Sequence, residues 1–297
     1  MQAGWIGLGG LGAAMARRLA ERGLLAGAWN RTRARGEKAL TGLSTTLSQT
    51  PVELARHCRL LFLCLADDTA VQEVMDSLEA ELRPGTVVVD VSTTAPATSA
   101  TLARRLATRG AQFVDAPVSG GVEGARTGAL VLFVGGSEAA LLSCQPAFAA
   151  LASRVAYLGR PGQGQAAKAV NQVLVAGINQ AVTEALALAD ALGLPGDVLR
   201  PALNHGMAGN RLLERRGEAL QAGHFAPGFR LALHHKDLTH AQALARELGA
   251  QLPLVEMTLI HYRRLMAEGA SDLDITALYR QKQRLFPGSP GSPGDSA

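Results

Sequence analysis

Aromatic and charged residues are both scarce in this chain of 297 residues, and their scarcity excludes several classes of protein. Phe, Trp and Tyr make up 4% of the residues and charged residues 18%, while 47% are hydrophobic. A disordered chain has the opposite balance, so we expect packed globular domains, with room for two of them. The net charge of +4 comes without a long Lys/Arg block, so the sequence does not indicate nucleic-acid binding. A weak basic excess suits small anionic ligands instead.

Cysteine is also rare, and its positions do not form a metal-binding pattern. Cys58, Cys64 and Cys144 lack metal-ligand spacing and are an odd number, which predicts free thiols in a reducing cytoplasm. His234 and His235 are adjacent, so on a regular element they cannot both face one ion, and we expect no metal site. The first residues enter an apolar run without a charged leader, so we expect no export.

Long apolar segments are missing except for residues 162–194, around which the chain is organised. Its apolar residues recur at spacings of three and four, which predicts a long helix, either amphipathic or fully buried; they are Val170, Leu174, Ile178, Val182, Leu186 and Ala189. At about 1.5 Å per residue the helix is long enough to cross one domain and reach a second. Because it carries Lys168 and Glu184 and is rich in alanine, we do not expect it to span a membrane.

The first turns of this helix carry Lys168, Asn171 and Gln172, which the spacing of three and four places on one face. Two interpretations are open. In the first, Lys168 reaches solvent while the side-chain amides of Asn171 and Gln172 cap neighbouring backbone. Alternatively, the lysine donates a proton and an amide orients a substrate.

The N-terminal half begins with the pattern of a dinucleotide-binding fold. Residues 2–8 are an apolar run, residues 13–22 a helix, and residues 24–29 a second apolar run, with Gly7-Leu8-Gly9-Gly10-Leu11-Gly12 between the first run and the helix. This strand, glycine turn, helix and strand provide the context that the G-x-G-x-x-G fingerprint requires. Gly7 would allow the tight turn, Gly9 the approach of a pyrophosphate, and Gly12 close packing of helix and strand. The free N–H groups of the helix would bind the phosphates.

The second strand ends in Asn30-Arg31-Thr32, without the acid that accepts from the ribose 2′-hydroxyl of NAD. Arg31 and Thr32 can donate to a 2′-phosphate, so the sequence favours NADP(H), with NAD(H) possible.

Further buried strands follow at residues 60–65 and 87–91. The loops at their C-terminal ends line the ligand crevice of such a sheet, which predicts cofactor contacts by Leu65, Ala66, Asp67 and Thr93. Thr94 is equally a candidate for the cap of the next helix, residues 96–109.

Residues 115–128 are so rich in glycine that we expect a loop between two strands, at residues 112–116 and 129–135. The exposed N–H groups around Gly120 and Gly121, with the hydroxyl of Ser119, suit a carboxylate. A plain connection between the strands is the alternative.

The second half shows helical segments and no strand pattern. The expected helices are residues 197–204, 210–222, 236–248, 253–268 and 273–285. Lys236 and Asp237 then stand at a charged helix start, and Asp274 caps the last helix. The Pro/Gly/Ser-rich residues 287–297 predict a disordered tail.

Three motifs in this order resemble the β-hydroxyacid dehydrogenase family. They are the glycine turn, Asp115-Ala116-Pro117-Val118-Ser119-Gly120-Gly121, and Gly162-Gln163-Gly164 followed by Lys168 and Asn171. The resemblance covers nearly the whole chain. It implies an α/β Rossmann N-terminal domain (residues 1–161) and an all-α C-terminal domain (residues 162–286), joined by a long interdomain helix with the active site between the domains. The family's habit also suggests a homodimer or homotetramer.

The resemblance assigns roles to single residues as well. Ser119, Gly120 and Gly121 would bind the substrate carboxylate, Lys168 would be the general acid/base, and Asn171 would hold the substrate oxygen. The substrate would also contact Phe229 and Asp237, and the cofactor would contact Lys236. Gln172 replaces an asparagine found in many members, which puts the role of that position in doubt. The segment ending in Asn30-Arg31-Thr32 is similar to the NADPH-dependent glyoxylate/succinic semialdehyde reductase branch.

These roles agree with the chemistry of hydride transfer to a carbonyl, which leaves an alkoxide that needs a proton. A partly desolvated lysine has a lowered pKa and can give and take that proton near neutrality. The sequence therefore favours an NADPH-dependent reductase of small aldehyde acids. One alternative is a 3-hydroxyisobutyrate dehydrogenase working in the oxidative direction with NAD. A non-catalytic nucleotide-binding protein is expected to lack Lys168, and an imine-reducing relative typically replaces it.

Overall fold

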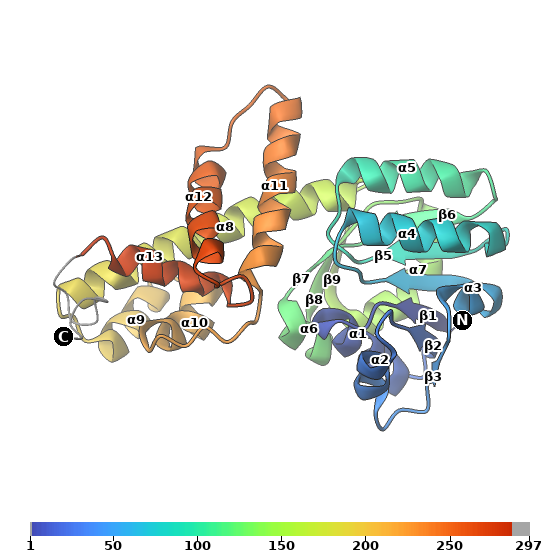
Figure 1. Cartoon of the computed structure of the whole chain (residues 1–297), viewed down its shortest axis with the longest axis horizontal. Helices are drawn as coiled ribbons and strands as arrows, with labels where there is room; N and C mark the ends of the chain where they lie inside the picture. Colours follow the sequence, from blue (N-terminus) through green and yellow to red (C-terminus); the bar gives the residue numbers. More distant parts are fainter. Residues whose placement is uncertain (1, 287–297) are drawn as a thin grey trace. The chain divides into compact units, whose positions relative to one another are not determined.

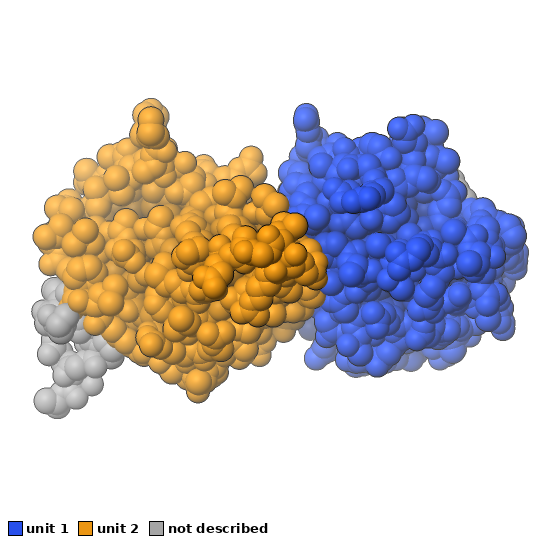
Figure 2. Space-filling view, turned by 90° about the horizontal axis from the view of Figure 1, so that it is seen from above, with its two compact units in different colours: residues 1–168 blue, residues 169–297 orange. Residues whose placement is uncertain are grey.

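The computed structural model describes residues 2–286, which form two compact units (Figure 2). Within the described residues, the first unit ends at Lys168 and the second begins at Ala169. The expected tail at residues 287–297 lies outside the described residues.

A six-stranded parallel sheet organises the first unit. Its strand order is β3-β2-β1-β4-β5-β6, with β1 Ala3–Ile6, β2 Leu25–Trp29, β3 Thr46–Leu47, β4 Leu60–Leu63, β5 Val87–Asp90 and β6 Gln112–Asp115. Every residue of β1, β4 and β5 is buried, as their continuous apolar runs predict. The order reverses between β1 and β4, where such sheets bind ligands beyond the strand ends. The predicted Rossmann fold is confirmed.

Helices cover both faces of this sheet, because strand side chains alternate between the faces. Trp5, Phe62 and Val89 point into one core with α1, and Ile6 and Leu61 into another with α4 and α5. Figure 1 shows α4 and α5 on one side of the sheet and α1 and α2 on the other. The helices are α1 Gly10–Glu21, α2 Arg33–Leu40, α3 Pro51–His57, α4 Asp68–Leu78, the 3-10 helix η1 Glu79–Glu81 and α5 Pro96–Ala107.

The expectation of a plain loop over residues 115–128 is wrong. The segment contains the short strand β7 Val118–Ser119 and the helix α6 Gly121–Thr127. Gly120 and Gly128 stand at the two ends of α6 with φ angles of 128° and 73°. These glycines lie at the ends of a helix, although a segment so rich in glycine is typical of a loop. A second sheet, β7-β8-β9, completes the unit with β8 Leu130–Val134, α7 Glu138–Leu151 and β9 Ala152–Tyr157.

The long helix α8, Gln163–Ala191, starts in the first unit and continues into the second. It is long and apolar enough to cross a membrane by composition alone, but 50% of its most apolar window is buried within the protein. Of the two alternatives for this helix, the fully buried one is wrong, since Val170, Leu174 and Ile178 are exposed. Inward positions in this stretch carry amides instead. Asn179 donates to Tyr262 Oη at 3.2 Å and to a backbone carbonyl.

The second unit is all helical, and the described residues after Tyr157 contain no strand. Its elements are α9 Gly196–His205, α10 Arg211–Gln221, α11 Leu231–Glu247, α12 Pro253–Ala267, the 3-10 helix η2 Ile275–Leu278 and α13 Tyr279–Gln283. Two predicted boundaries are wrong. α11 begins five residues before Lys236, so Lys236 and Asp237 lie in its second turn. The last expected helix is split into η2 and α13.

Candidate functional site

The three glycines of the N-terminal turn have the geometry that the dinucleotide fingerprint requires. Gly7 has a φ of 99°, and a Cβ there would lie 2.3 Å from the carbonyl oxygen of Cys64. A Cβ on Gly12 would lie 2.2 Å from the carbonyl oxygen of Gly7. At Gly9 nothing lies within 4 Å of the added atom. Gly7 and Gly12 are therefore required by the fold, whereas Gly9 leaves open space for a pyrophosphate.

The helix that follows this turn offers unused N–H groups. α1 begins at Gly10, not at residue 13 as expected, and its N-cap Gly9 makes no side-chain capping bond. Gly10, Leu11 and Gly12 therefore form its first turn, and the first amides of a helix have no intrahelical acceptor. This end of α1 fits the phosphates of a dinucleotide.

Asn30 supports the glycine turn from the end of β2. Its Oδ1 accepts from the amide of Leu8 at 2.9 Å, and its Nδ2 donates to the carbonyl of Thr32 at 2.8 Å. The Asn30 amide is thus engaged within the protein. Arg31 and Thr32 are exposed beside it and carry the predicted preference for a 2′-phosphate.

The loops after β4 and β5 are held in shape by their own polar groups. The amide of Leu65 donates to Ser92 Oγ at 2.8 Å, and Asp67 caps α4 by accepting from Ala70 at 2.9 Å. Ala66 is exposed and Thr93 half-buried between these anchors. Of the two alternatives for Thr94, capping of α5 is not observed, because Ala95 is the N-cap and Thr94, directly before it, is buried.

The predicted carboxylate site lies directly beside the glycine turn. Ser119 ends β7, Gly120 is the N-cap of α6, and Gly121 is its first residue. A Cβ on Gly10 would lie 4.0 Å from Val122 Cγ2, so the first turns of α1 and α6 touch. The residues predicted to bind the cofactor phosphates and those predicted to bind the substrate carboxylate thus lie side by side in the first unit.

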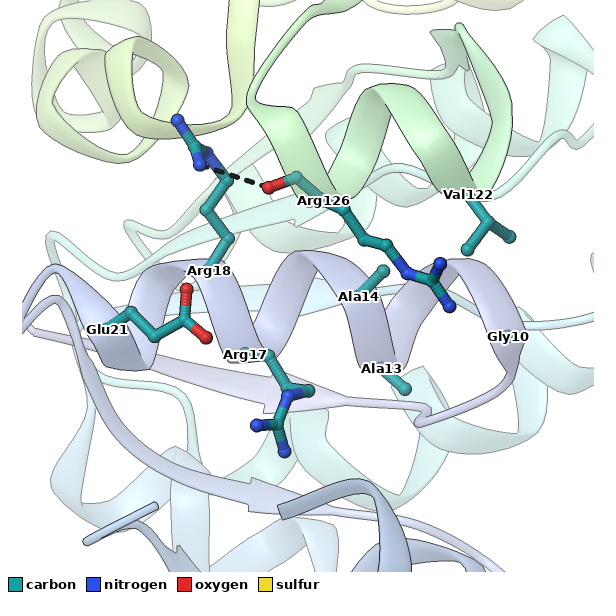
Figure 3. Close-up of a pocket in the computed structure, with 8 residues that line it drawn as sticks. All are labelled: Gly10, Ala13, Ala14, Arg17, Arg18, Glu21, Val122 and Arg126. Carbon is teal, nitrogen blue, oxygen red and sulfur yellow. Dashed lines mark hydrogen bonds between the residues drawn. The ribbon is translucent and has the colours of Figure 1, made fainter. Parts of the chain in front are cut away.

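An open groove of about 370 Å³ runs along α1 next to α6 (Figure 3). Of the predicted cofactor residues it includes only Gly10. Arg17 donates to the carbonyls of Ala39 and Thr41, each at 3.0 Å, and Arg18 donates to that of Arg126 at 3.1 Å. Arg17 and Arg18 thus hold α1 against its neighbours, while the side chain of Arg126 lines the groove toward Gly10 (Figure 3).

Sequence reasoning missed two buried aspartates at the ends of neighbouring strands. Asp90 and Asp115 are register partners on β5 and β6, and both are fully buried. Burial raises the pKa of Asp90 to about 7 and that of Asp115 to about 6, although hydrogen bonds to each carboxylate oppose the rise. The only signal in the sequence is an aspartate that closes each apolar run.

The raised pKa of Asp90 predicts a pH-dependent stability. The pKa of Asp90 in the folded state lies above the ordinary value of 3.8. The contribution of the Asp90 side chain to folding stability is therefore complete below pH 3.8 and is lost as the pH rises through about 7. We expect Asp90→Asn to gain stability relative to the wild type between about pH 5 and about pH 8. Urea unfolding at both pH values measures the difference. A difference that does not change with pH contradicts this expectation.

Lys168 is buried near the start of α8, exposing 7% of its surface. The interpretation of a solvent-exposed lysine is therefore wrong. The two amides do not cap backbone either. Asn171 Nδ2 donates to Gln172 Oε1 at 2.9 Å, and Gln172 Nε2 donates to Asp237 Oδ2 at 2.7 Å. Gln172, whose role the sequence left in doubt, thus links Asn171 to a buried carboxylate.

The residues predicted in the second unit form one packed polar cluster. Lys236 Nζ lies 3.3 Å from Asp237 Oδ1, and the ring of Phe229 packs at 5.2 Å from that of His234. His234, which sequence reasoning did not select, is buried between Tyr262 Oη at 3.0 Å and the carbonyl of Gln172 at 3.2 Å.

Asp274 fixes the backbone beside this cluster. It accepts from the amide of Phe229 at 3.0 Å and caps η2, and this capping confirms the predicted role of Asp274. Within residues 2–286, no three His, Cys, Asp or Glu side chains are grouped so that they could hold a metal ion.

Comparison with known proteins decides the family. Residues 2–159 match the model of the NAD binding domain of 6-phosphogluconate dehydrogenase, and residues 162–281 that of the NAD-binding domain of NADP-dependent 3-hydroxyisobutyrate dehydrogenase. The chain is 36% identical over 284 residues to 2-hydroxy-3-oxopropionate reductase of Escherichia coli, covering 94% of this chain and 96% of that protein. The chain belongs to the β-hydroxyacid dehydrogenase family. Membership makes it an NAD(P)-dependent oxidoreductase of hydroxy acids.

Two solved structures are similar to nearly the whole chain. One is Mycobacterium tuberculosis 3-hydroxyisobutyrate dehydrogenase with L-serine, at a TM-score of 0.84 and 27% identity, covering 95% of this chain and 99% of that one. Another is Psf3 in complex with NADP+ and 2-OPP, at a TM-score of 0.85 and 26% identity, covering 93% and 98%.

Proposed function

We propose that this protein is an NADPH-dependent reductase of small aldehyde acids, with Lys168 as general acid/base. The observation that carries the proposal is the burial of Lys168 one turn before Asn171, on a helix whose start is fixed to the dinucleotide-binding sheet. A buried lysine without a chemical task is costly, because burial disfavours its charged form.

Each group of the chain has a distinct task in this proposal. When bound, the reduced nicotinamide supplies the hydride. The N–H groups at Gly120 and Gly121, with the hydroxyl of Ser119, hold the substrate carboxylate. Lys168 donates a proton to the carbonyl oxygen as it becomes a hydroxyl, and Asn171 donates a hydrogen bond to the same oxygen. In the oxidative direction Lys168 accepts the proton.

A panel of substrates tests the proposed activity. NADPH oxidation is followed with glyoxylate, succinic semialdehyde, tartronate semialdehyde and methylmalonate semialdehyde, and the reverse reaction with 3-hydroxy acids. Turnover of at least one aldehyde acid supports the proposal, and no turnover of any compound contradicts it. The likeness to 3-hydroxyisobutyrate dehydrogenase favours one alternative, oxidation of 3-hydroxyisobutyrate with NAD. If the protein oxidises 3-hydroxyisobutyrate with NAD faster than it reduces any aldehyde acid with NADPH, that alternative is selected.

The preference for NADP(H) is proposed from Arg31 and Thr32, with support from the relative bound to NADP+. We expect Arg31→Asp to lower the ratio of kcat/KM for NADPH over NADH by about tenfold or more, because the carboxylate repels a 2′-phosphate and accepts from a 2′-hydroxyl. Arg22→Asp makes the same charge change at the exposed far end of α1 and serves as control. An unchanged ratio in Arg31→Asp, or an equal shift in the control, rules out this contact.

We also propose that a second copy of the chain covers the exposed side of α8. The apolar residues that this helix exposes recur at spacings of three and four and form what we call the apolar stripe: Val170, Leu174, Ile178, Ala181, Ala185 and Leu188. Glu184 is exposed on the same helix and pairs with Lys282 at 2.6 Å. The stripe continues onto α12 through Leu254, which would lie 3.3 Å from a Cβ on Gly177. Met257 and Ile260 of α12 are exposed as well, and contiguous exposed apolar surface of this kind marks interaction sites. A twofold axis makes such a stripe complementary to itself.

The two leucines Leu174 and Leu142 allow a matched test of this interface, because both expose 64% of their surface and only Leu174 is in the stripe. We expect light scattering to show a multimer for the wild type and for Leu142→Glu, but a monomer for Leu174→Glu. Burying an unpaired carboxylate in the interface costs several kcal/mol. A monomeric wild type, or wild type that binds lipid vesicles through this stripe, contradicts the proposal.

A further inference from the structure

The start of α8 is tied to the dinucleotide-binding sheet by one buried carboxylate. Asp115 Oδ1 accepts from the amide of Gly162 at 2.8 Å, and Oδ2 accepts from that of Gln165 at 2.9 Å. These are N–H groups at a helix start, which lack intrahelical acceptors. The carboxylate also places negative charge at the positive end of the helix dipole. Asp115 therefore acts as a cap for α8 although it lies 47 residues before Gly162.

The surroundings of this carboxylate leave the helix start little freedom. The main chain of Asp115 pairs with that of Gly135 in both directions, at 3.0 and 2.9 Å. A Cβ on Gly135 would lie 2.6 Å from Asp115 Oδ1, and one on Gly164 would lie 2.4 Å from the carbonyl of Phe133. Both positions thus require glycine, because the helix start lies against the strand ends at backbone contact distance.

A second side chain ties the same turn to the neighbouring strand. Gln165 Oε1 accepts from the amide of Thr94 at 3.1 Å, and its Nε2 donates to the carbonyl of Ser92 at 2.8 Å. Gln165 is buried, and both backbone partners belong to the loop after β5. The first turn of α8 is therefore held by the ends of β5 and β6 together.

Lys168 is three residues after Gln165 and four after Gly164, so its backbone lies in the turn that directly follows the anchored one. We infer that Asp115 is a positioning residue for proton transfer, which holds the first turn of α8 so that Lys168 meets the substrate oxygen. This inference rests on the proposed role of Lys168 as general acid/base. It assigns to Asp115, the missed aspartate of β6, a function beyond capping α8.

Asp90 provides a matched control for Asp115. The two are register partners on adjacent strands and are equally buried, but Asp90 accepts from the Ser92 amide at 2.9 Å and not from α8. At both positions asparagine has nearly the same shape as the aspartate that it replaces. In Asp115→Asn one of the two helix amides loses its acceptor and the charge at the helix start disappears. In Asp90→Asn the direct contacts of α8 are kept, because Asp90 binds the Ser92 amide and the Thr94 hydroxyl, whereas Gln165 binds the Ser92 carbonyl and the Thr94 amide.

The test compares Asp115→Asn, Asp90→Asn and Lys168→Ala in the full chain. It measures the dissociation constant of NADPH, kcat and KM for an aldehyde acid, and hydrogen exchange over residues 162–168. For Asp115→Asn we expect NADPH binding and KM within about threefold of the wild type, a fall in kcat of about tenfold to a hundredfold, and faster exchange at the start of α8. For Asp90→Asn we expect kcat within about threefold of the wild type. If Asp115→Asn does not fold, Gln165→Ala replaces it, with a smaller expected fall in kcat.

The outcomes separate this inference from the function on which it rests. If Lys168→Ala turns over normally, the proposed acid/base role fails, whatever Asp115→Asn does. If Lys168→Ala is inactive while Asp115→Asn keeps the kcat of the wild type, only the positioning role is overturned. Equal losses of kcat, NADPH binding and stability in Asp115→Asn and Asp90→Asn would show a structural role alone, which also overturns it.

Discussion

Lys168→Ala binds NADPH normally but loses kcat by about a thousandfold, because proton transfer from a positioned side chain contributes about 10² to 10⁴ to the rate. The loss appears in kcat more than in KM, since the carboxylate contacts of Ser119, Gly120 and Gly121 are unchanged. Stopped-flow oxidation of NADPH measures the chemical step, and fluorescence titration measures cofactor binding.

A second variant controls for the cavity that the alanine leaves. Lys168→Met keeps most of the buried volume but has no proton to give, so we expect a loss as large as that of Lys168→Ala. An added primary amine can enter the space left by alanine and restore part of the rate, but it cannot enter beside methionine. Turnover near that of the wild type in either variant contradicts the acid/base role.

The second large effect is a contrast between two glycines of one turn. Gly9→Val folds but binds NADPH at least about a hundredfold more weakly, because the side chain fills the open space beside the free amides of α1. Gly12→Val does not fold stably, because its Cβ would lie 2.2 Å from the carbonyl of Gly7 between helix and strand.

Circular dichroism and urea unfolding measure the fold of both variants, and fluorescence titration measures NADPH binding. We expect Gly12→Val to lose more than about 3 kcal/mol of unfolding free energy, and Gly9→Val to lose less than about 1 kcal/mol. The assignment of the turn is wrong if Gly9→Val binds NADPH as tightly as the wild type does. It is also wrong if the two variants are equally unstable.

The sequence predicted the features that depend on local spacing. The roles of Gly7, Gly9 and Gly12 follow from strand, turn and helix being adjacent in the chain. The structure agrees at Gly7 and Gly12 and leaves open space at Gly9. The buried strands β4 and β5 were visible as uninterrupted apolar runs. Local glycine density, in contrast, was misleading between residues 115 and 128. There the glycines terminate α6 and do not extend a loop.

Features that depend on contacts distant in the chain could not be predicted. The caps that Asp115 and Gln165 provide connect segments 47 to 73 residues apart, and an aspartate after an apolar run has no partner in its own neighbourhood. The side of α8 that is buried was also misjudged, because inward amides such as Asn179 bond to Tyr262 of α12. Gln172 was undervalued for the same reason, since its partner Asp237 lies on α11.

One measurement tests the central claim most directly, namely that this site reduces an aldehyde held by its carboxylate. A single turnover of NADPH is followed with succinic semialdehyde and with butanal, which has the same chain length but no carboxylate. The account predicts that succinic semialdehyde oxidises NADPH at least about a hundredfold faster than butanal does, and that this difference becomes much smaller in Ser119→Ala. Equal rates with the acid and the neutral aldehyde in the wild type would contradict it.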